Sequence, residues 1–361
     1  MKKEFRRVWI GNLKVLLLVL AVKLTAIYRP DWVENYYSIP VFPKIGAFQR
    51  VLSGILPFSA GDILYAIALI YLLVIVFDII NAAFKRTLRF TYFLLECSYN
   101  FKTFLWLYLV FLFLWGLNYD RLGIGNQTKL QPAAYSPTDL KEFTCQLVEK
   151  MNENRLLMGD KYDYPAEIDI FIAARDAYHT ASDSFPFFDY QDPAIKKSLY
   201  GRLSNYLGIT GYYNPFSGEA NVNIRVPQVY IPYVTCHEIG HQLGYAKESE
   251  ASFAGYLAGR VSEDSAMRYS TYFDIFSYAN NELYNVDSAS ARDNYRQLDT
   301  LVKKDIREVR EFNKKNRNSI EPLMRLMYSK YLQLNNQPTG ILAYNEVVGW
   351  VIAYWKKYGK I

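Results

Sequence analysis

Three long apolar segments in the first third of the chain constrain its fold most strongly. They cover residues 8–28, 62–80 and 102–119, and each approaches the roughly 20 residues that a helix needs to cross a bilayer. The alternatives are buried core helices and, for the first segment, a signal peptide. The first segment lacks a small-residue cleavage motif, and two similar segments follow it. The sequence therefore predicts three transmembrane helices in a membrane anchor over residues 1–119.

Basic residues flank these segments and predict their orientation. One group precedes the first segment and the other lies between the second and third: Lys2, Lys3, Arg6 and Arg7, then Lys85, Arg86, Arg89 and Lys102. The positive-inside rule places both groups in the cytoplasm, with residues 29–61 as an outer loop at the membrane interface. Three spans that start from a cytoplasmic N-terminus leave residues 120–361 outside the cytoplasm.

The distribution of charge argues against a nucleic-acid partner. Residues 1–119 hold 13 Lys and Arg against 6 Asp and Glu, whereas residues 120–361 hold 28 against 29. A nucleic-acid-binding domain would carry the positive excess on its globular part. We therefore expect a lipid bilayer as partner, and no nucleic acid.

The motif His237-Glu238-Ile239-Gly240-His241 indicates metal chemistry. Residues four apart lie on one face of a helix, so both imidazoles can reach one Zn²⁺ ion. Glu238 lies beside the first of them and is placed to act as general base on a zinc-bound water. The alternative is an ordinary buried helix, but the chain has only three His, so a chance pair at this spacing is rare. Gly244 stands where the helix would end on a left-handed residue.

A zinc hydrolase needs a third protein ligand. In the metzincin pattern it is a His three residues after the Gly, and here that position is Lys247, which excludes the class. A carboxylate from the next helix remains, either Glu248 or Glu250. Side chains two positions apart on a helix point about 200° apart, so we expect only one of the two to bind the ion.

Residues 211–227 break the helical pattern before the motif. Residues 221–226 alternate polar and mainly β-branched residues, which predicts an edge strand that ends at Pro227. Such a strand can hold an extended peptide through backbone hydrogen bonds, which makes Asn221 and Asn223 the predicted substrate-binding residues. An ordinary hairpin strand is the alternative.

The rest of the chain is predicted to be helical. The expected helices after the anchor cover residues 137–153, 165–182, 193–207, 246–262, 265–284, 289–316, 320–334 and 344–358. His179 is expected to be an ordinary histidine and Cys236 a buried small residue. The predicted fold class is mainly α: three transmembrane helices, then a mostly helical zincin-like catalytic domain over residues 120–361 with a small β element before the motif helix.

Several motifs together resemble a known family. They are Tyr212-Tyr213-Asn214-Pro215-Phe216, Gly218-Glu219-Ala220-Asn221-Val222-Asn223, the His237 to Gly244 motif, Glu248-x-Glu250-Ala251 and Pro57-Phe58-Ser59-x-Gly61-Asp62. The chain is similar, over almost its whole length, to a family of uncharacterised bacterial membrane proteins placed with the gluzincin-like metallopeptidases. The resemblance implies a bacterial cytoplasmic (inner) membrane, and a domain that is periplasmic in a diderm cell. It favours Glu248 as third ligand, because Ala251 and Ser252 then stand where gluzincins have a small residue and a polar orienting residue.

These observations predict a membrane-anchored zinc metallopeptidase, an endopeptidase or amidase that cuts a peptide, a protein or a cell-wall amide outside the cytoplasm. The alternative is a non-catalytic binding or assembly module of the cell envelope with a structural zinc. A closed structural site needs a fourth protein ligand, and no further Cys or His follows nearby to supply it. A transporter is excluded because only three spans are found and none is a broken helix with central polar pairs.

The orientation is testable with reporters fused after Ile361. Alkaline phosphatase fused there should be active, and green fluorescent protein should be dark, because the C-terminal domain is predicted outside the cytoplasm. The reverse pattern would contradict three spans that start from a cytoplasmic N-terminus.

Overall fold

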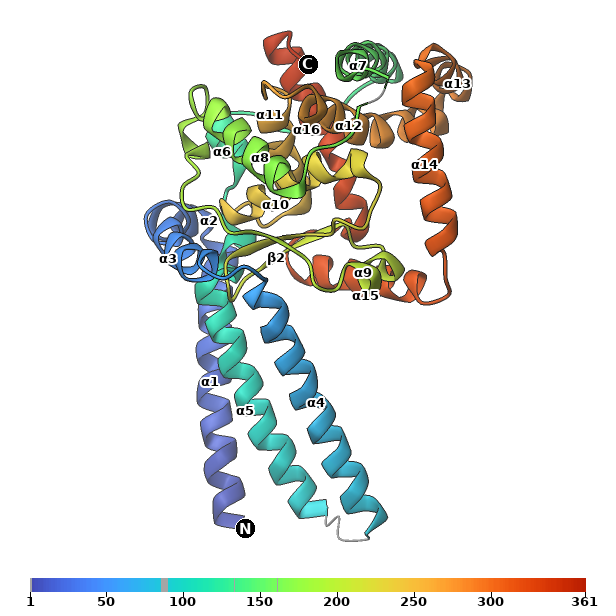
Figure 1. Ribbon diagram of the computed structural model, residues 1–361. Coiled ribbons are helices and arrows are strands. Elements are labelled where there is room, and N and C mark those ends of the chain that lie inside the picture. The colour runs from blue at the N-terminus through green and yellow to red at the C-terminus, as the bar shows by residue number, and fades with distance from the viewer. Residues whose placement is uncertain (1, 86–89, 133, 161) are drawn as a thin grey trace.

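The computed structural model describes residues 2–85, 90–132, 134–160 and 162–361. Figure 1 shows three long helices that run side by side away from a globular body. The body is helical apart from a small sheet that precedes the helix of the His237 motif. The predicted mainly α fold is therefore confirmed. Arg86 and Arg89, which contribute to the predicted orientation, lie outside the described residues.

The three long helices are α1 (Lys2–Tyr28), α4 (Ala60–Phe84) and α5 (Phe90–Leu114). Within them, Glu4–Tyr28, Ala60–Phe84 and Phe93–Leu114 are long and apolar enough to cross a membrane. None of the residues in the most apolar part of α4 is buried by the rest of the protein. Apolar side chains exposed over this length suit a lipid environment.

The third apolar segment starts earlier than its predicted range of 102–119. Helix α5 begins at Phe90, so Lys102 lies inside the helix and not in a loop. The polar residues near Ser98 lower the hydropathy of this part, but they pair between helices. Asn12 of α1 donates hydrogen bonds of 2.9 Å to both the carbonyl and the hydroxyl oxygen of Ser98. After Leu114 the chain forms a 3-10 turn, η2 (Gly116–Asp120).

The segment between α1 and α4 is helical and packs on the body, whereas an outer loop was predicted. It forms α2 (Pro30–Trp32), the π-helical turn η1 (Val33–Ser38) and α3 (Phe42–Gly54). Gln49 of α3 donates to the carbonyl oxygens of Pro215 and Phe216 at 2.8 and 3.0 Å. Contacts therefore cross the predicted boundary at residue 119, and the division into two domains stays a prediction.

The sheet has three strands in the order β1-β3-β2. The strands are β1 (Ile195–Lys197), β2 (Gly211–Asn214) and β3 (Glu219–Val222). The prediction of an edge strand over 221–226 is wrong, because β3 is central: it is parallel to β1 and antiparallel to β2. The prediction of a helix over 193–207 is also wrong in its first half. This stretch forms β1, which covers the edge of β3, and only then α9 (Gly201–Leu207).

The two faces of β3 contact different parts of the molecule. On one face Val222 packs against Ile231 and Val234 of α10 (Ile231–Gln242). Successive residues of a strand point to opposite faces, so Glu219 lies on the other face. Its carboxylate accepts hydrogen bonds from the backbone N–H groups of Ala60 and Gly61, at 3.0 and 2.6 Å. A Cβ atom at Gly61 would lie 2.5 Å from the Asn214 amide, so this approach requires glycine. The start of α4 is thus attached to the sheet.

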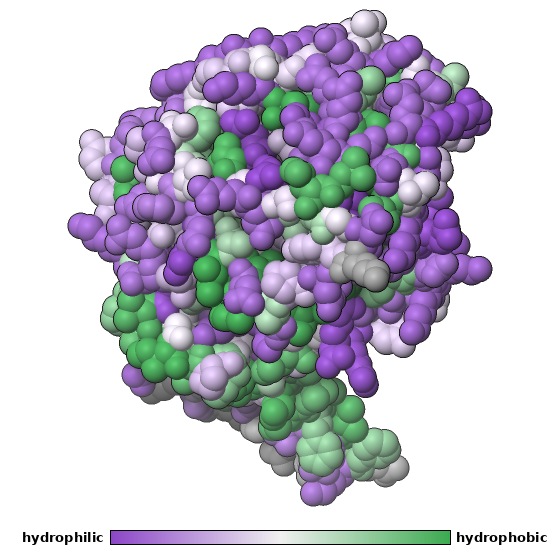
Figure 2. All heavy atoms as spheres, turned by 45° about the horizontal axis from the view of Figure 1, so that its top comes forward, coloured by the Kyte–Doolittle hydropathy of each residue, from purple (hydrophilic) through white to green (hydrophobic). Residues whose placement is uncertain are grey.

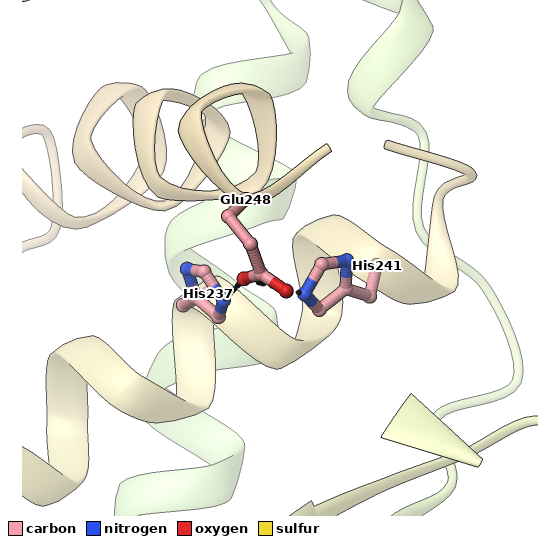
Figure 3. Close-up of side chains that lie close together, drawn as sticks. All are labelled: His237, His241 and Glu248. Atoms are coloured by element: carbon pink, nitrogen blue, oxygen red, sulfur yellow. Dashed lines mark ion pairs between the residues drawn. The ribbon is translucent and has the colours of Figure 1, made fainter. Parts of the chain in front are cut away.

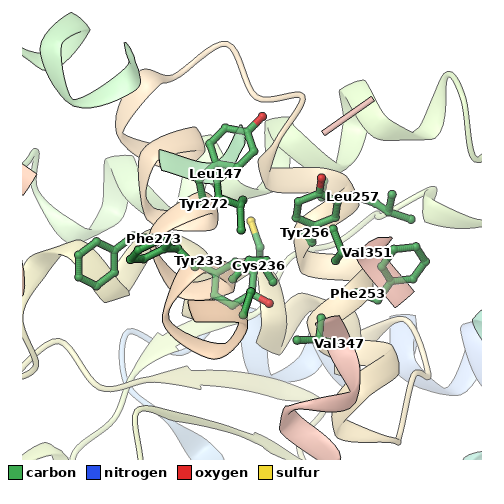
Figure 4. Packing of buried hydrophobic residues seen from close by; sticks show 14 of the residues in the cluster. Leu147, Tyr233, Cys236, Phe253, Tyr256, Leu257, Tyr272, Phe273, Val347 and Val351 are labelled. Atoms are coloured by element: carbon green, nitrogen blue, oxygen red, sulfur yellow. The ribbon is translucent and has the colours of Figure 1, made fainter. Parts of the chain in front are cut away.

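The helical core surrounds α10 and α11 (Glu248–Gly259). Around them lie α7 (Pro137–Met158), α8 (Glu167–Ser182), α12 (Ser265–Val286) and α16 (Glu346–Tyr358). Figure 4 shows Cys236 among the core side chains, where it is fully buried as predicted, with its sulfur 3.5 Å from that of Met267. Ser136 and Asp139 form a capping box, so the predicted start of α7 is confirmed.

The remaining elements pack around these helices, and most of them add buried side chains to the same core. They are α6 (Ile124–Thr128), η3 (Pro186–Phe188), η4 (Gln228–Tyr230), α13 (Ser288–Gln297), α14 (Thr300–Asn316), α15 (Glu321–Leu334) and η5 (Gly340–Tyr344). The single helix predicted over 289–316 is two helices. Asp299 starts the second one, because its side chain accepts from the Leu301 N–H at 2.8 Å.

A buried ion pair joins η1 to the chain after η2. The Arg121 guanidinium donates to both carboxylate oxygens of Glu34, at 2.8 and 2.7 Å, and both side chains are almost fully buried. Arg121 also donates to the Gly244 carbonyl oxygen at 3.2 Å, in the turn between α10 and α11. This pair therefore connects the anchor to the motif helix.

Glu34→Gln should destabilise the full chain in detergent. The substitution keeps the side-chain shape but leaves the Arg121 guanidinium buried without its counter-charge, which typically costs about 3–5 kcal/mol. Asp31→Asn is the matched control, because Asp31 also accepts two hydrogen bonds from an arginine, Arg29, but on the exposed surface. Thermal unfolding followed by tryptophan fluorescence should show a large shift for the first variant and little for the second. Equal shifts would contradict a structural role for the buried pair.

Candidate metal centre

Helix α10 places His237 and His241 on one face, one turn apart. Every residue of α10 is buried, which suits its lack of charged residues before the motif. The helix ends as predicted: Gly244 has φ +91°, and a Cβ atom there would lie 2.9 Å from the Phe42 ring. This left-handed residue reverses the chain and leads directly into α11.

Glu248 is the first residue of α11 and meets both histidines. Its Oε2 atom lies 3.2 Å from Nε2 of His237 and 3.5 Å from Nε2 of His241 (Figure 3). One potential ligand atom from each residue lies within 4.8 Å of the others, and all three residues are buried. The structure therefore brings together the three predicted ligands in a group that could hold a metal ion.

The second nitrogen of each imidazole has its own partner. Nδ1 of His237 lies 3.1 Å from the Ser252 hydroxyl, and Nδ1 of His241 lies 2.7 Å from the Tyr245 carbonyl oxygen. These contacts orient the rings and leave both Nε2 atoms directed at the centre. Ser252 thus contacts a ligand from the position where a polar orienting residue was expected.

Residues from far along the chain hold Glu248. Tyr328 of α15 donates to Oε1 of Glu248 at 2.6 Å, and the Glu248 N–H donates to Oε1 of Gln337 at 2.9 Å. The Tyr344 ring stacks on His237, with ring centroids 6.2 Å apart. Sequence reasoning missed these three residues. The chain contains 32 Tyr, and no local spacing distinguishes Tyr328 or Tyr344 from the others.

Glu250, the alternative ligand, points away from this group. Its carboxylate accepts from the Ile124 N–H and from Nζ of Lys247, both at 3.2 Å. A spacing of two residues turns its side chain to the other side of α11. His179 is exposed on α8 and is also outside the group.

Glu238 lies next to the group and is buried without being a ligand. Its Oε2 atom has no hydrogen-bond partner among the described residues. A Cβ atom at Gly211 of β2 would lie 2.5 Å from Oε1 of Glu238, so the carboxyl group packs where only glycine leaves room. Burial raises the pKa of Glu238 to about 8. A cation bound nearby would oppose this rise, because positive charge stabilises the carboxylate form.

The electrostatics of the ligands also favour a cation. Burial alone would raise the pKa of Glu248, but the imidazoles of His241 and His237 hold it well below its ordinary value. Burial lowers the pKa of His237. Burial alone would also lower the pKa of His241, but the Glu248 carboxylate outweighs it and raises this pKa to about 9. A buried carboxylate between two imidazoles is the donor set that Zn²⁺ prefers.

Asn221 and Asn223 do not lie on a free strand edge. Asn223 donates to Oδ1 of Asn205 at 2.7 Å and to the carbonyl oxygens of Gly201 and Ile209, so its side chain supports the loops around α9. The Asn221 side chain is fully buried on the central strand, and its amide atoms have no partner within the described part of the chain. The outer strand that contacts the site is β2, through Gly211.

The chain just after α5 reaches the metal group. The Trp115 ring meets the His241 ring edge to face, with centroids 6.0 Å apart, and packs on Tyr213 at 4.4 Å. The Tyr119 and Tyr331 hydroxyl oxygens lie 3.1 Å apart, which connects η2 to α15. The site therefore lies where the three long helices enter the body.

Removing Glu248 should remove the metal. Glu248→Ala leaves two imidazoles, so zinc affinity should fall by more than the roughly 10–100-fold typical for loss of an outer hydrogen-bond partner. Glu250→Gln is the control, since it keeps the shape of the neighbouring carboxylate outside the group. Zinc per chain, measured by mass spectrometry on the purified full-length protein, decides between them. Full zinc in the first variant with loss in the second would move the ligand to Glu250.

Comparisons with known proteins give one match. A search of curated proteins finds none, and a search of solved structures finds none. A family model described as "Protein of unknown function (DUF3810)" matches residues 37–352, which include α3, the sheet and the metal group. The kinship with gluzincin-like peptidases stays a prediction. Because the match covers most of the chain, this protein belongs to the DUF3810 family, whose function is unknown.

Proposed function

We propose that this chain is a zinc-dependent metallopeptidase, an endopeptidase or amidase, anchored by α1, α4 and α5 in a bacterial membrane. One observation carries the proposal. Three buried ligand atoms converge on one point, and the carboxyl group of Glu238 lies beside them with one oxygen unpaired within the described residues. A purely structural role for the group gives no reason for this second buried carboxyl group with an unpaired oxygen.

The donor set fits zinc. Two imidazole nitrogens and one carboxylate oxygen are the three protein ligands of many catalytic zinc sites, which keep a fourth position open. When bound, zinc supplies Lewis-acid catalysis, because it polarises a carbonyl group and makes water more acidic. His237, His241 and Glu248 would hold it, and the hydrogen bonds to Ser252, Tyr245 and Tyr328 keep them oriented.

Glu238 would move the proton. Its unpaired oxygen accepts a proton from the attacking water and then gives it to the leaving amine nitrogen, as general base and general acid. Gly211 leaves the space in which this side chain is held. The outer strand β2 passes beside Glu238 and is better placed than β3 to align an extended peptide.

A hydroxyl group near the centre could stabilise the negative charge that develops on the carbonyl oxygen. Tyr344 stacks on His237, and its hydroxyl interacts with Glu248 and Tyr328. Tyr344 and Tyr328 are therefore the residues that we assign to the surroundings of the reacting carbonyl.

A non-catalytic envelope module with a structural zinc is the second candidate. The burial of all three ligands favours it, since structural sites are closed. A fourth His, Cys or carboxylate ligand would complete such a site, and the described residues bring only three together. Zinc that stays bound without any turnover would support this alternative.

Glu238→Gln separates the two functions. The substitution keeps the side-chain size but removes the base, so zinc per chain should be unchanged while turnover falls by roughly 10² to 10⁴. The assay uses the zinc-loaded full chain in nanodiscs with a proteome-derived peptide mixture, and counts new amino termini by mass spectrometry. Glu250→Gln serves as the control with an intact base. Equal turnover by wild type and Glu238→Gln would refute the assigned mechanism.

A further inference from the structure

Helix α15 exposes an unusual amount of apolar surface. Leu323, Leu326 and Met327 are each more than half exposed, Leu334 is 81% exposed, and Leu332 is the one fully buried residue of the helix. Contiguous apolar surface of this kind marks an interaction site in a soluble body. The surface therefore requires a partner.

The helix α9 extends the same surface. Leu199, Leu203 and Tyr206 are exposed in and just before α9, and α9 contacts α15. Asn318, in the connection before α15, donates to the Tyr206 carbonyl oxygen at 2.8 Å. We call the exposed side chains of Leu199, Leu203, Tyr206, Leu323, Leu326, Met327 and Leu334 the α9–α15 face.

This face is continuous with the long apolar helices. In Figure 1, α9 and α15 lie along the lower side of the body, beside the point where α4 enters it. The Tyr200 hydroxyl donates to the carbonyl oxygen of Asp62 in the first turn of α4, at 2.7 Å. Tyr331 of α15 contacts Tyr119 just after α5. By contrast, the upper side of the body is covered mainly by hydrophilic side chains (Figure 2).

The charges around the face suit phospholipid headgroups. Arg202, Arg225, Arg325 and Lys330 are exposed there, and Glu321 is the one acidic residue within residues 199–208 and 320–335. An open hollow of about 520 Å³ is lined by Leu199, Tyr200, Arg202, Leu203 and Arg225. Long basic side chains beside apolar ones place their charge at the lipid phosphates while their stems stay in apolar surroundings.

We propose that the α9–α15 face is a second membrane contact. The face lies in the headgroup region of the leaflet that is nearer to the globular body. The partner is the bilayer that holds α1, α4 and α5. Helix α15 then contacts lipid with one side, and the metal ligand Glu248 through Tyr328 with the other. The metal group lies at the lipid surface. Resting on the proposed hydrolase function, we infer that its substrates are peptides or proteins anchored in that leaflet.

Fluorescence from single labelled sites tests the contact without any activity assay. The full chain with Cys97→Ser and Cys145→Ser keeps only Cys236, which is buried. In this background Leu326→Cys and Leu203→Cys carry an environment-sensitive nitrobenzoxadiazole label, in nanodiscs of phosphatidylethanolamine and phosphatidylglycerol. Leu157→Cys on α7 and Val286→Cys on α12, which are also exposed, are the matched controls.

Labels at 326 and 203 should be quenched by nitroxide-labelled phospholipid and protected from iodide, whereas the controls should show the opposite. Iodide quenching at all four positions would overturn the membrane contact. Protection from both quenchers at 326 and 203 would overturn it too, because protein and not lipid would then cover the face.

A kinetic comparison tests the substrate class. The probe is one peptide that the wild type cleaves, in a soluble form and with a palmitoyl anchor, on vesicles of the same lipids. Leu326→Glu with Leu203→Glu should raise KM for the anchored peptide at least tenfold and leave the soluble peptide unchanged. Equal effects on both forms would refute leaflet-anchored substrates while the hydrolase stands. If the wild type cleaves no peptide of the proteome-derived mixture, the hydrolase and the substrate class drawn from it are refuted, and the fluorescence result alone decides the membrane contact.

Discussion

The reversal of the chain between α10 and α11 is the constraint on which the metal group depends. His237 and His241 are neighbours by helix geometry alone, but Glu248 reaches them only because the chain turns at Gly244. The Gly240 and His241 carbonyl oxygens at the end of α10 accept hydrogen bonds from the backbone of the turn, and side chains bind the carbonyl groups that follow. Arg50 donates to the Gln242 carbonyl oxygen at 3.3 Å, and Arg121 to that of Gly244. Two buried guanidinium groups thus hold the turn in place.

Through these arginines, segments next to the long helices support the turn that carries the chain from α10 to α11. Arg50 lies on α3 and Arg121 follows η2, so neither belongs to the helices that carry the ligands. Trp115 adds a ring contact to His241. A fragment over residues 120–361 would lack Arg50, Trp115 and the Glu34 partner of Arg121. The full chain is therefore the unit in which the metal group is supported.

Local spacing explains what could be predicted from the sequence. His237, His241 and Glu248 follow from helix periodicity and one glycine, and the long apolar helices follow from composition. Tyr328 and Gln337 could not be predicted, because they reach Glu248 from 80 and 89 residues away. The strand β1 is only three residues long and exists through its pairing with β3, so local propensity misses it and mistakes β3 for an edge. The predicted third span omits the polar part of α5, because the polar residues there lower its hydropathy. Their partner, Asn12, lies on another helix, and local hydropathy does not show this pairing.

The attachment of α4 to the sheet has a consequence for the order of assembly during synthesis. The first N–H groups of α4 donate hydrogen bonds to the Glu219 carboxylate. Glu219 is synthesised 158 residues after Gly61. Until the ribosome has synthesised β3, these N–H groups lack the Glu219 carboxylate as their partner. The start of α4 is then not held against the sheet. Folding of the sheet then fixes the start of a helix that was synthesised earlier. A part of the chain that is synthesised later thus completes the arrangement of an earlier part.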